Sequence, residues 1–256
     1  MRRFSPSLPP RRFRGACHFT VVTVLLLLGV ASTAPAQTIV PGTSDPYLAG
    51  MPNGSACCSG DVAPTNSPVQ VTTIAVTPGA TITFNVTGGV DNTGAPPTLS
   101  PDGGSVFTTS PNNGIAGATW PINALVGVFL DSSLPTSTPA PADLDFSGSG
   151  MGTSFTTLSP GLKQAFFIGD GLTGTGTGSV QTFVVPAGAT RLFLGTSDGF
   201  GWFNNSGSFS VTVAVSGGPP PGPVAAPIPV PTSSDALLAL MMLALAALAL
   251  RALRRG

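Results

Sequence analysis

The residues best suited to bind a metal ion lie together in one short segment of this chain. Residues 192–213 read LFLGTSDGFGWFNNSGSFSVTV and combine one carboxylate, Asp198, with two adjacent amides, Asn204 and Asn205. Calcium takes about six to eight oxygen ligands, which carboxylates, side-chain amides and backbone carbonyls supply. No residue of the segment suits a soft transition metal. The pattern therefore predicts a calcium site in a loop between two strands.

A purely structural interpretation of this segment stays open. Asp and Asn are common turn residues in glycine-rich loops, and Asp198-Gly199 is a frequent turn pair. The aromatic side chains of the loop are ambiguous too, because such rings either stack on the face of a sugar or fill a core. They belong to Phe200, Trp202 and Phe203.

Chemistry based on histidine is excluded for the mature chain. The sole histidine, His18, lies with Cys17 in an N-terminal segment that has the features of a signal peptide. Its removal leaves no Ser-His-Asp, Cys-His or His-based zinc site. Cys57 and Cys58 are adjacent, so they cannot link distant segments. They could form a vicinal disulfide, pair between chains or stay as thiols, and an incidental loop pair is favoured over a redox role.

Composition argues against a nucleic-acid partner and against an enzyme. Between residues 37 and 218 the only basic residues are Lys163 and Arg191, against nine Asp. This part of the chain has no basic patch that could neutralise phosphates. Glycoside hydrolysis needs two placed carboxylates, and the candidates lie in no recognisable catalytic motif. These candidates are Asp143, Asp145 and Asp170.

The central part of the chain is predicted to be all-β. Threonine and valine are frequent, glycine and proline mark turns, and no amphipathic helical stretch occurs before residue 236. Residues 209–215 (FSVTVAV) alternate between apolar and polar side chains, as a strand does. The other predicted strands cover residues 69–76, 80–86, 124–130, 164–168, 180–185 and 190–194. Short strands separated by turns predict one antiparallel β-sandwich or jelly roll.

The two ends have the features of export and membrane signals. Arginines, an apolar run (FTVVTVLLLLGV) and Ala34-Pro35-Ala36 follow one another as in a secretory signal peptide that is cleaved before Gln37. An uncleaved N-terminal anchor is the alternative, although the run is short for a bilayer. Residues 236–250 carry no charge and precede a basic end. They predict a hydrophobic helix that spans a membrane if its arginines reach the headgroups.

These features divide the chain into five parts. We expect a signal peptide, a loop-rich N-terminal segment, the β-sandwich domain, a proline-rich linker with a sorting signature, and a hydrophobic helix with a basic end. In that order they cover residues 1–36, 37–67, 68–216, 217–235 and 236–256.

The C-terminal layout resembles the sorting domains of the PEP-CTERM and IPTL-CTERM type, which have a short proline-containing signature, one hydrophobic helix and a basic cluster. The signature here is Ile228, Pro229, Val230, Pro231 and Thr232, and the basic cluster is Arg251, Arg254 and Arg255. No Glu-Trp pair follows the signature, which departs from the usual pattern. The resemblance implies a Gram-negative bacterial host and an exosortase-like membrane protease as a partner. It also implies transient or permanent membrane anchoring through the C-terminal helix.

The segment around Asp198 resembles the calcium loop of the calcium-dependent galactophilic bacterial lectins, which are called PA-IL-like. Their loop has an Asp and later Asn-Asn followed by Ser-Gly-Ser-Phe, a string that residues 204–209 match. These lectins are small β-sandwiches in which the bound sugar coordinates calcium directly. Weaker likeness extends to residues 88–94 and 110–126, where Ser110 and Asn113 take the places of the family's His and Gln.

The lectin resemblance implies two sets of site residues. The metal would be held by Asp198, Asn204, Asn205 and backbone carbonyls, one from Gly201 or Trp202 and one from Asn92 or Thr93, with Trp202 and Thr93 as the predicted donors. The sugar would contact Ser110, Asn113, Asp198, Gly199 and Asn204.

Together these patterns predict an exported, C-terminally sorted protein of the cell envelope or outer surface, or a secreted one, that binds a glycan or exopolysaccharide through calcium. The alternative is a non-catalytic structural protein of the envelope or extracellular matrix that binds no sugar.

Overall fold

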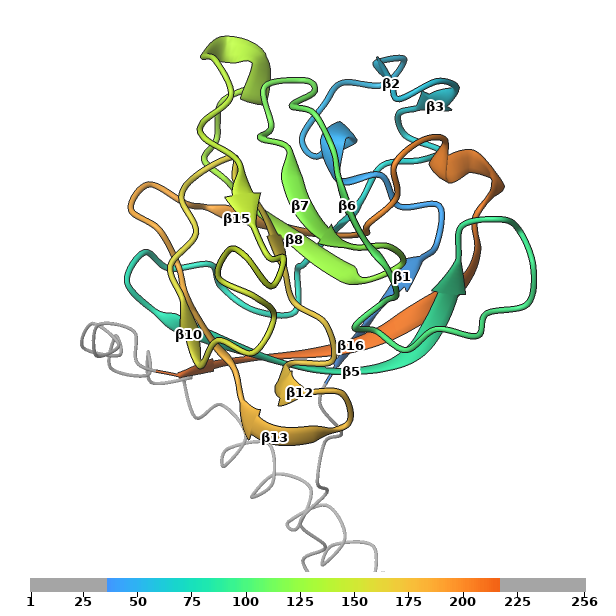
Figure 1. The fold of residues 1–256 in the computed structure, drawn as a ribbon. Helices are drawn as coiled ribbons and strands as arrows, with labels where there is room; N and C mark the ends of the chain where they lie inside the picture. The colour runs from blue at the N-terminus through green and yellow to red at the C-terminus, as the bar shows by residue number, and fades with distance from the viewer. Residues whose placement is uncertain (1–35, 217–256) are drawn as a thin grey trace, which may run out of the picture. The chain divides into compact units, whose positions relative to one another are not determined.

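The computed structural model of the protein describes residues 36–216, whose regular secondary structure consists almost entirely of β-strands (Figure 1). The predicted all-β class is confirmed. The helical elements of this range are three short 3-10 turns: η1 (Pro46–Leu48), η2 (Pro135–Ser137) and η3 (Trp202–Asn204). Within residues 36–216, no helix is both long and apolar enough to cross a bilayer. The predicted signal peptide and C-terminal helix lie outside the described residues.

The largest sheet has five strands. In spatial order they are β1 (Gln37–Pro41), β16 (Ser206–Ser216), β5 (Thr81–Asp91), β14 (Thr182–Val184) and β10 (Thr157–Leu158). β16 and β5 pair antiparallel along their whole length, and only β10 runs parallel to its neighbour. Alternation buries Phe209, Val211 and Val213 on one face of β16, as predicted.

The second sheet has four antiparallel strands. They are β11 (Ala165–Phe167), β8 (Leu125–Leu130), β15 (Arg191–Thr196) and β4 (Val69–Gln70). Every residue of β8 is buried, which agrees with its continuous apolar run. Figure 1 shows β8 and β15 above β16 and β5, so the two sheets face each other.

Aromatic side chains fill the core between the two sheets. Phe166 of β11 and Phe183 of β14 come from different sheets, and their ring centroids lie 5.7 Å apart. Phe84 of β5 packs edge-on against Phe183 at 5.0 Å. All three side chains are buried, so the two sheets share one hydrophobic core.

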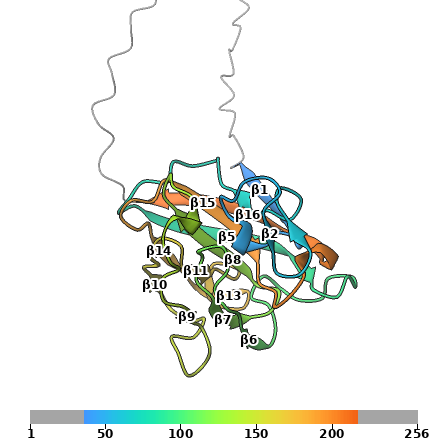
Figure 2. The same cartoon turned by 90° about the horizontal axis from the view of Figure 1, so that it is seen from above.

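Three small sheets complete the described part of the chain. They pair β2 (Ala56–Cys57) with β3 (Asp61–Val62), β12 (Leu172–Gly174) with β13 (Thr177–Val180), and β7 (Ala118–Pro121) with both β6 (Val106–Thr108) and β9 (Leu144–Asp145). Figure 2 shows β6, β7 and β9 grouped on one side of the core.

Several strands differ in length from the sequence prediction, and β4 and β5 show the physical reasons. β4 is short because the chain leaves the sheet after Val71, whose N–H still bonds the Leu192 carbonyl, and then runs along the surface. β5 continues past the predicted end at Val86, through two glycines, to Asp91. A Cβ atom at Gly88 would overlap the Ser208 carbonyl, so glycine here permits close strand pairing rather than ending the strand.

Candidate functional site

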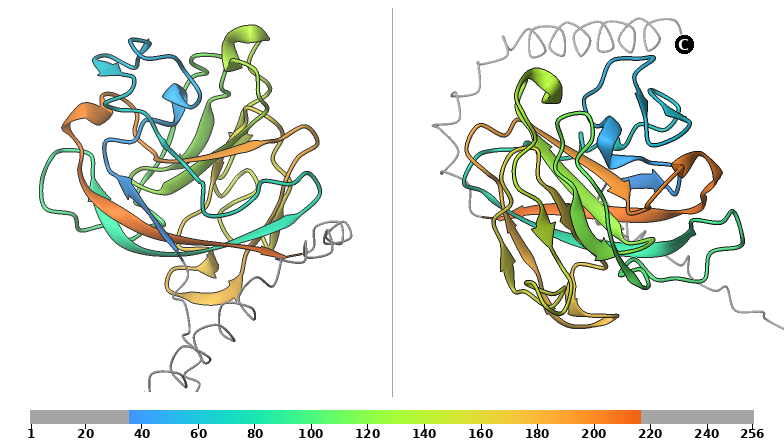
Figure 3. Two further views of the ribbon diagram at one scale, coloured as in Figure 1. Left: turned by 180° about the vertical axis from the view of Figure 1, so that it is seen from behind. Right: turned by 45° about the horizontal axis from the view of Figure 1, so that its top comes forward.

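Three segments that are far apart in the sequence are tied together beside the end of β15. The hydroxyl of Thr196 donates to the Gly42 carbonyl at 2.7 Å, and the Thr196 N–H donates to the Ser44 carbonyl at 2.9 Å. The amide of Asn205, just after η3, also donates to the Gly42 carbonyl, at 3.1 Å. Figure 3 shows the N-terminal segment in blue next to the orange loop that leads into β16. The segment between β1 and β4 is therefore held against the end of β15 and the loop that follows it.

Asp61, the first residue of β3, holds η3 in place. Its two carboxylate oxygens accept the N–H of Trp202 at 3.0 Å and the N–H of Phe203 at 2.7 Å. Backbone N–H groups at the start of a helical turn lack partners within the turn, so a carboxylate satisfies them well. The Trp202 indole also donates to the Thr196 carbonyl at 2.7 Å. These three hydrogen bonds hold the loop after β15 against β3 and against the end of β15.

Near these contacts, three side chains each leave a buried oxygen without a hydrogen-bond partner among the described residues. Asp45 accepts the Tyr47 N–H through Oδ1, and its Oδ2 is unpartnered. Asp198 accepts the Gly199 N–H through Oδ1, and its Oδ2 is likewise unpartnered. The same holds for Oδ1 of Asn205. Asp45, Asp61, Asp198 and Asn205 are called the acidic site below.

The acidic site is deeply buried and carries only negative charge. Asp45 and Asp61 are 0 % exposed and Asp198 is 3 % exposed. The two basic residues between residues 36 and 216 are bound elsewhere through backbone carbonyls. Lys163 donates to the carbonyls of Pro135, Thr138 and Pro139, and Arg191 donates to those of Asp131 and Ser133. Buried carboxylates without a cation are costly, because burial removes their hydration.

Burial raises the pKa values of all three carboxyl groups, and repulsion from neighbouring carboxylates adds to it for Asp45 and Asp61. Burial raises the pKa of Asp45 to about 8, although the Tyr47 N–H opposes it, and the charges of Asp61 and Asp198 raise it further. Burial also raises the pKa of Asp198, with the Asn205 amide acting in the opposite direction. The pKa of Asp61 rises for the same reason, with a contribution from Asp198. Asp45 therefore responds to the charges of both Asp61 and Asp198, and Asp61 responds to that of Asp198.

The donor atoms of the acidic site fit a hard divalent cation. Carboxylate and amide oxygens are the ligands of calcium, whereas soft metals prefer thiolate or imidazole nitrogen. The unpartnered atoms are Oδ2 of Asp45, Oδ2 of Asp198 and Oδ1 of Asn205. A cation there would offset the repulsion and satisfy oxygens that lack donors.

The structure separates the five predicted metal ligands. Asp198 and Asn205 belong to the acidic site, whereas the Asn204 side chain is exposed. The Trp202 carbonyl accepts the Asn205 N–H at 3.0 Å. Thr93 is exposed, and both its N–H and its hydroxyl donate to Oδ1 of Asp91, which lowers the pKa of Asp91. The calcium role of these residues stays a prediction.

The predicted sugar-contacting residues do not line one common hollow. Asn113 donates to the Ala56 carbonyl of β2 at 3.2 Å. Ser110, three residues earlier in the chain, is exposed. A shallow hollow of about 440 Å³ lies between residues 111–114 and 136–140, and its lining includes Asn113. Gly199 and Asn204 belong to the loop after β15 and do not line this hollow.

Two of the three carboxylates considered for catalysis, Asp145 and Asp170, serve as turn caps. Asp145 accepts the Ser147 N–H at 2.8 Å, and the Ser147 groups lower the pKa of Asp145. Asp170 accepts the N–H groups of Leu172 and Gly176. A general acid requires a raised pKa, so Asp145 is poorly suited to that role.

Sequence reasoning missed Asp45 and Asp61. Each stands in a loop-rich segment with an ordinary turn context, Ser-Asp-Pro and Gly-Asp-Val, so no local pattern marks them. Their one distinguishing feature is charge balance: nine Asp residues share this region with two basic residues, so some carboxylates must lack a cationic partner.

No protein-family model matches this chain, and a search of curated proteins finds no match to its sequence. The predicted sorting signature, residues 228–232, and the arginines at 251, 254 and 255 lie outside the described residues.

The substitution Asp198→Asn should weaken calcium binding by at least about tenfold, because it removes one of three carboxylate charges from the acidic site. Isothermal titration with calcium chloride measures this effect. Asp145→Asn is the matched control, because it removes the same charge from an exposed turn. Equal affinities of the wild type and Asp198→Asn would refute the assignment.

Calcium-free protein should lose stability as the pH rises from about 4 to about 8. The Asp45 pKa is about 8 in the folded protein, above its unfolded value of about 3.9, so the folded state binds the proton more tightly. This contribution is complete below pH ~4 and is lost as the pH passes the folded pKa.

Urea denaturation in the presence of a chelator measures the free energy of unfolding at pH 5 and pH 8. Asp45→Asn should reduce the difference between the two values, and calcium should restore stability at pH 8. The neighbouring titratable groups are Asp61, Asp198 and Tyr47. Stability that is constant or rises between the two pH values would contradict the prediction.

Proposed function

We propose that the protein binds calcium at the acidic site and uses it to hold the loop that displays Phe200 and Phe203. One observation carries this proposal: Asp45, Asp61 and Asp198 are all buried, the charges of the other two raise the pKa of Asp45, and Asp45 and Asp198 each keep an oxygen without a hydrogen-bond partner among the described residues. A divalent cation is the simplest way to make that arrangement favourable.

We further propose that the calcium-bound loop binds carbohydrate, as the lectin resemblance implies. Phe200 is 71 % exposed and Phe203 is 57 % exposed, while Trp202 between them is buried. The Phe203 ring lies against Gly60 in the turn between β2 and β3, where a Cβ atom would be 3.3 Å away. Exposed rings held by a rigid support are suited to stack on sugar faces. The ligand would be a glycan or exopolysaccharide.

The finer fold proposal is an antiparallel β-sandwich or jelly roll. The two larger sheets contact each other through Phe166 and Phe183, and almost all their pairings are antiparallel. Such folds place loops at the ends of the strands, where binding residues gather. The loop after β15 occupies such a position, which supports the lectin-like assignment.

A second candidate function is a non-catalytic structural protein of the envelope or matrix. The complete burial of Asp45 and Asp61 favours this structural role, because a cation bound by fully buried carboxylates could stabilise the domain without contacting a ligand. In this case calcium would join the N-terminal segment to the loop before β16, and Phe200 and Phe203 would contact a protein neighbour.

Delivery to the cell surface belongs to the same proposal. The basic and apolar N-terminus supports export, and the arrangement of residues 228–256 supports recognition by an exosortase-like membrane protease. The C-terminal hydrophobic stretch would hold the protein at the membrane before or after sorting.

Calorimetry with calcium and a panel of mono- and oligosaccharides distinguishes the two candidate functions. The lectin proposal predicts sugar binding that disappears in a calcium chelator. Phe200→Ala should weaken it several-fold, because it removes a stacking surface, whereas Val180→Ala, which alters another exposed apolar side chain, should not. Calcium binding with no measurable heat of sugar binding would favour the structural candidate.

Deletion of the chain from Pro227 onward tests the sorting proposal. The truncated protein should appear in the medium, because it lacks the signature, the hydrophobic stretch and the terminal arginines. Replacing residues 236–256 by a synthetic apolar helix with the same arginines is the control for anchoring alone. Retention of the truncated protein in the cell fraction would contradict an anchoring role.

A further inference from the structure

The two adjacent cysteines form a disulfide in the tight turn between β2 and β3. Cys57 is the last residue of β2, and the turn of Cys58, Ser59 and Gly60 leads directly into Asp61. The Cys57 side chain is buried, whereas Cys58 is half-buried and accessible from solvent. The disulfide therefore lies between solvent, on the side of Cys58, and the acidic site, which begins at Asp61.

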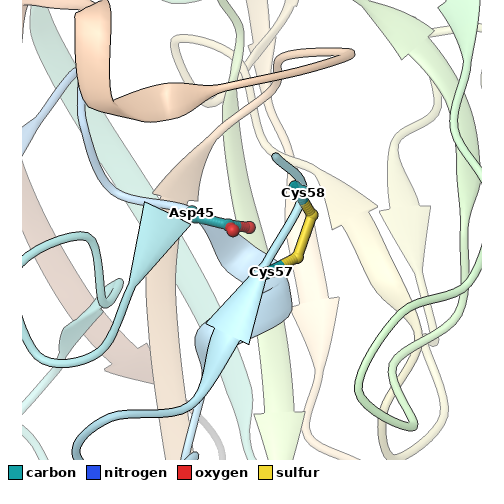
Figure 4. A group of neighbouring side chains, drawn as sticks. All are labelled: Asp45, Cys57 and Cys58. Carbon is teal, nitrogen blue, oxygen red and sulfur yellow. A yellow bond between two sulfur atoms is a disulfide. The ribbon is translucent and has the colours of Figure 1, made fainter. Parts of the chain in front are cut away.

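One carboxylate of the acidic site adjoins this disulfide, and a second residue of the site is paired with Cys57 through the backbone. A carboxylate oxygen of Asp45 and the sulfurs of Cys57 and Cys58 all lie within 4.8 Å of one another. Figure 4 shows the Asp45 carboxylate pointing towards the chain at the two cysteines. Cys57 is also the cross-strand partner of Asp61 in the β2–β3 pair. A rearrangement at the disulfide would therefore act on the Asp45 side chain directly and on Asp61 through the β2–β3 backbone.

The turn has a backbone conformation that needs support. Cys58 and Ser59 adopt positive φ values of 49° and 71°, a region that non-glycine residues adopt only when their surroundings enforce it. The covalent link between residues 57 and 58 is one such support. A hydrogen bond from the Asn112 amide to the Cys58 sulfur, at 3.7 Å, is another. Opening the link removes the covalent support and leaves Asp61 on a freer turn.

We propose that the Cys57–Cys58 disulfide is a site of reversible thiol–disulfide exchange that sets the calcium affinity of the acidic site. This inference rests on the calcium binding proposed above. The reductant would be a low-molecular-weight thiol. Oxidation closes the turn and holds Asp61 and Asp45 in position for calcium, and reduction weakens binding.

The exchange balances in two steps. A small thiolate attacks the sulfur of Cys58, the less buried of the two cysteines, a bond forms between those two sulfurs, the Cys57–Cys58 bond breaks, and the Cys57 sulfur leaves and takes up a proton. A second small thiolate then attacks the sulfur of the first small molecule, which releases the Cys58 sulfur to be protonated. Two small thiols are thereby oxidised to one disulfide, and the protein gains two electrons and two protons.

Thermodynamic linkage makes the coupling reciprocal. If reduction weakens calcium binding by a given factor, calcium must oppose reduction of the disulfide by the same factor. We expect a factor of about ten, within the usual range of coupling between neighbouring sites. This equality can be tested without any knowledge of the sugar ligand.

The experiment uses the full chain with Cys17→Ser, so that the only thiols are those of the pair. Calcium titrations compare the oxidised protein, the protein reduced by a phosphine, and the same sample after reoxidation. Affinity should fall about tenfold on reduction and recover on reoxidation. The double substitution Cys57→Ser and Cys58→Ser should give the weak affinity whether or not reductant is present.

The reverse measurement follows the oxidised fraction in glutathione redox buffers with and without calcium, by thiol alkylation and mass spectrometry. Calcium should shift the equilibrium towards the disulfide by the same factor. Equal calcium affinity in both redox states, or a redox equilibrium indifferent to calcium, would overturn the inference while leaving the proposed function intact. Absence of calcium binding by the oxidised protein would overturn both.

Discussion

The burial of three carboxylates in one place is the constraint on which the described structure depends. Removing a carboxylate from water is costly, and placing several together adds repulsion. The protein offsets part of this cost with backbone N–H groups, two of them on Asp61 and one on Asp45. Oxygens of Asp45 and Asp198 remain without donors, so the site is favourable only if these groups are protonated or share a cation.

This constraint connects parts of the chain that the sheets alone would not join. β1 pairs with β16 along its length, but the residues after β1 reach the acidic site through Thr196 and Asn205 rather than through strand pairing. The turn that carries Asp61 contacts η3 through the Asp61 carboxylate and through Gly60, which lies against the Phe203 ring. The buried Asp61 carboxylate thereby fixes the position of η3 and of the loop that exposes Phe200 and Phe203.

Much of the fold could be predicted from local patterns. The alternation in residues 209–215 and the apolar run in residues 124–130 correspond to β16 and β8, because side-chain periodicity reflects which face of a strand is buried. The candidate site was predictable only in part. Asp198 and Asn205 share a loop and could be recognised together, but Asn204, which precedes Asn205, is exposed, since adjacent side chains point in different directions. Asp61 meets Trp202 across 141 residues, a contact that no local pattern encodes.

The sequence by itself determined the all-β class, the excess of carboxylates over cations and the absence of histidine from the described region, because these follow from composition and short-range periodicity. Only the tertiary structure decided which carboxylates share a site. It brought Asp45 and Asp61 beside Asp198, placed the cysteine pair against Asp45, and turned Phe200 and Phe203 outwards. The physical reason is that strand pairing and core packing bring distant loops together, and electrostatic interactions depend on distance in space rather than on separation in sequence.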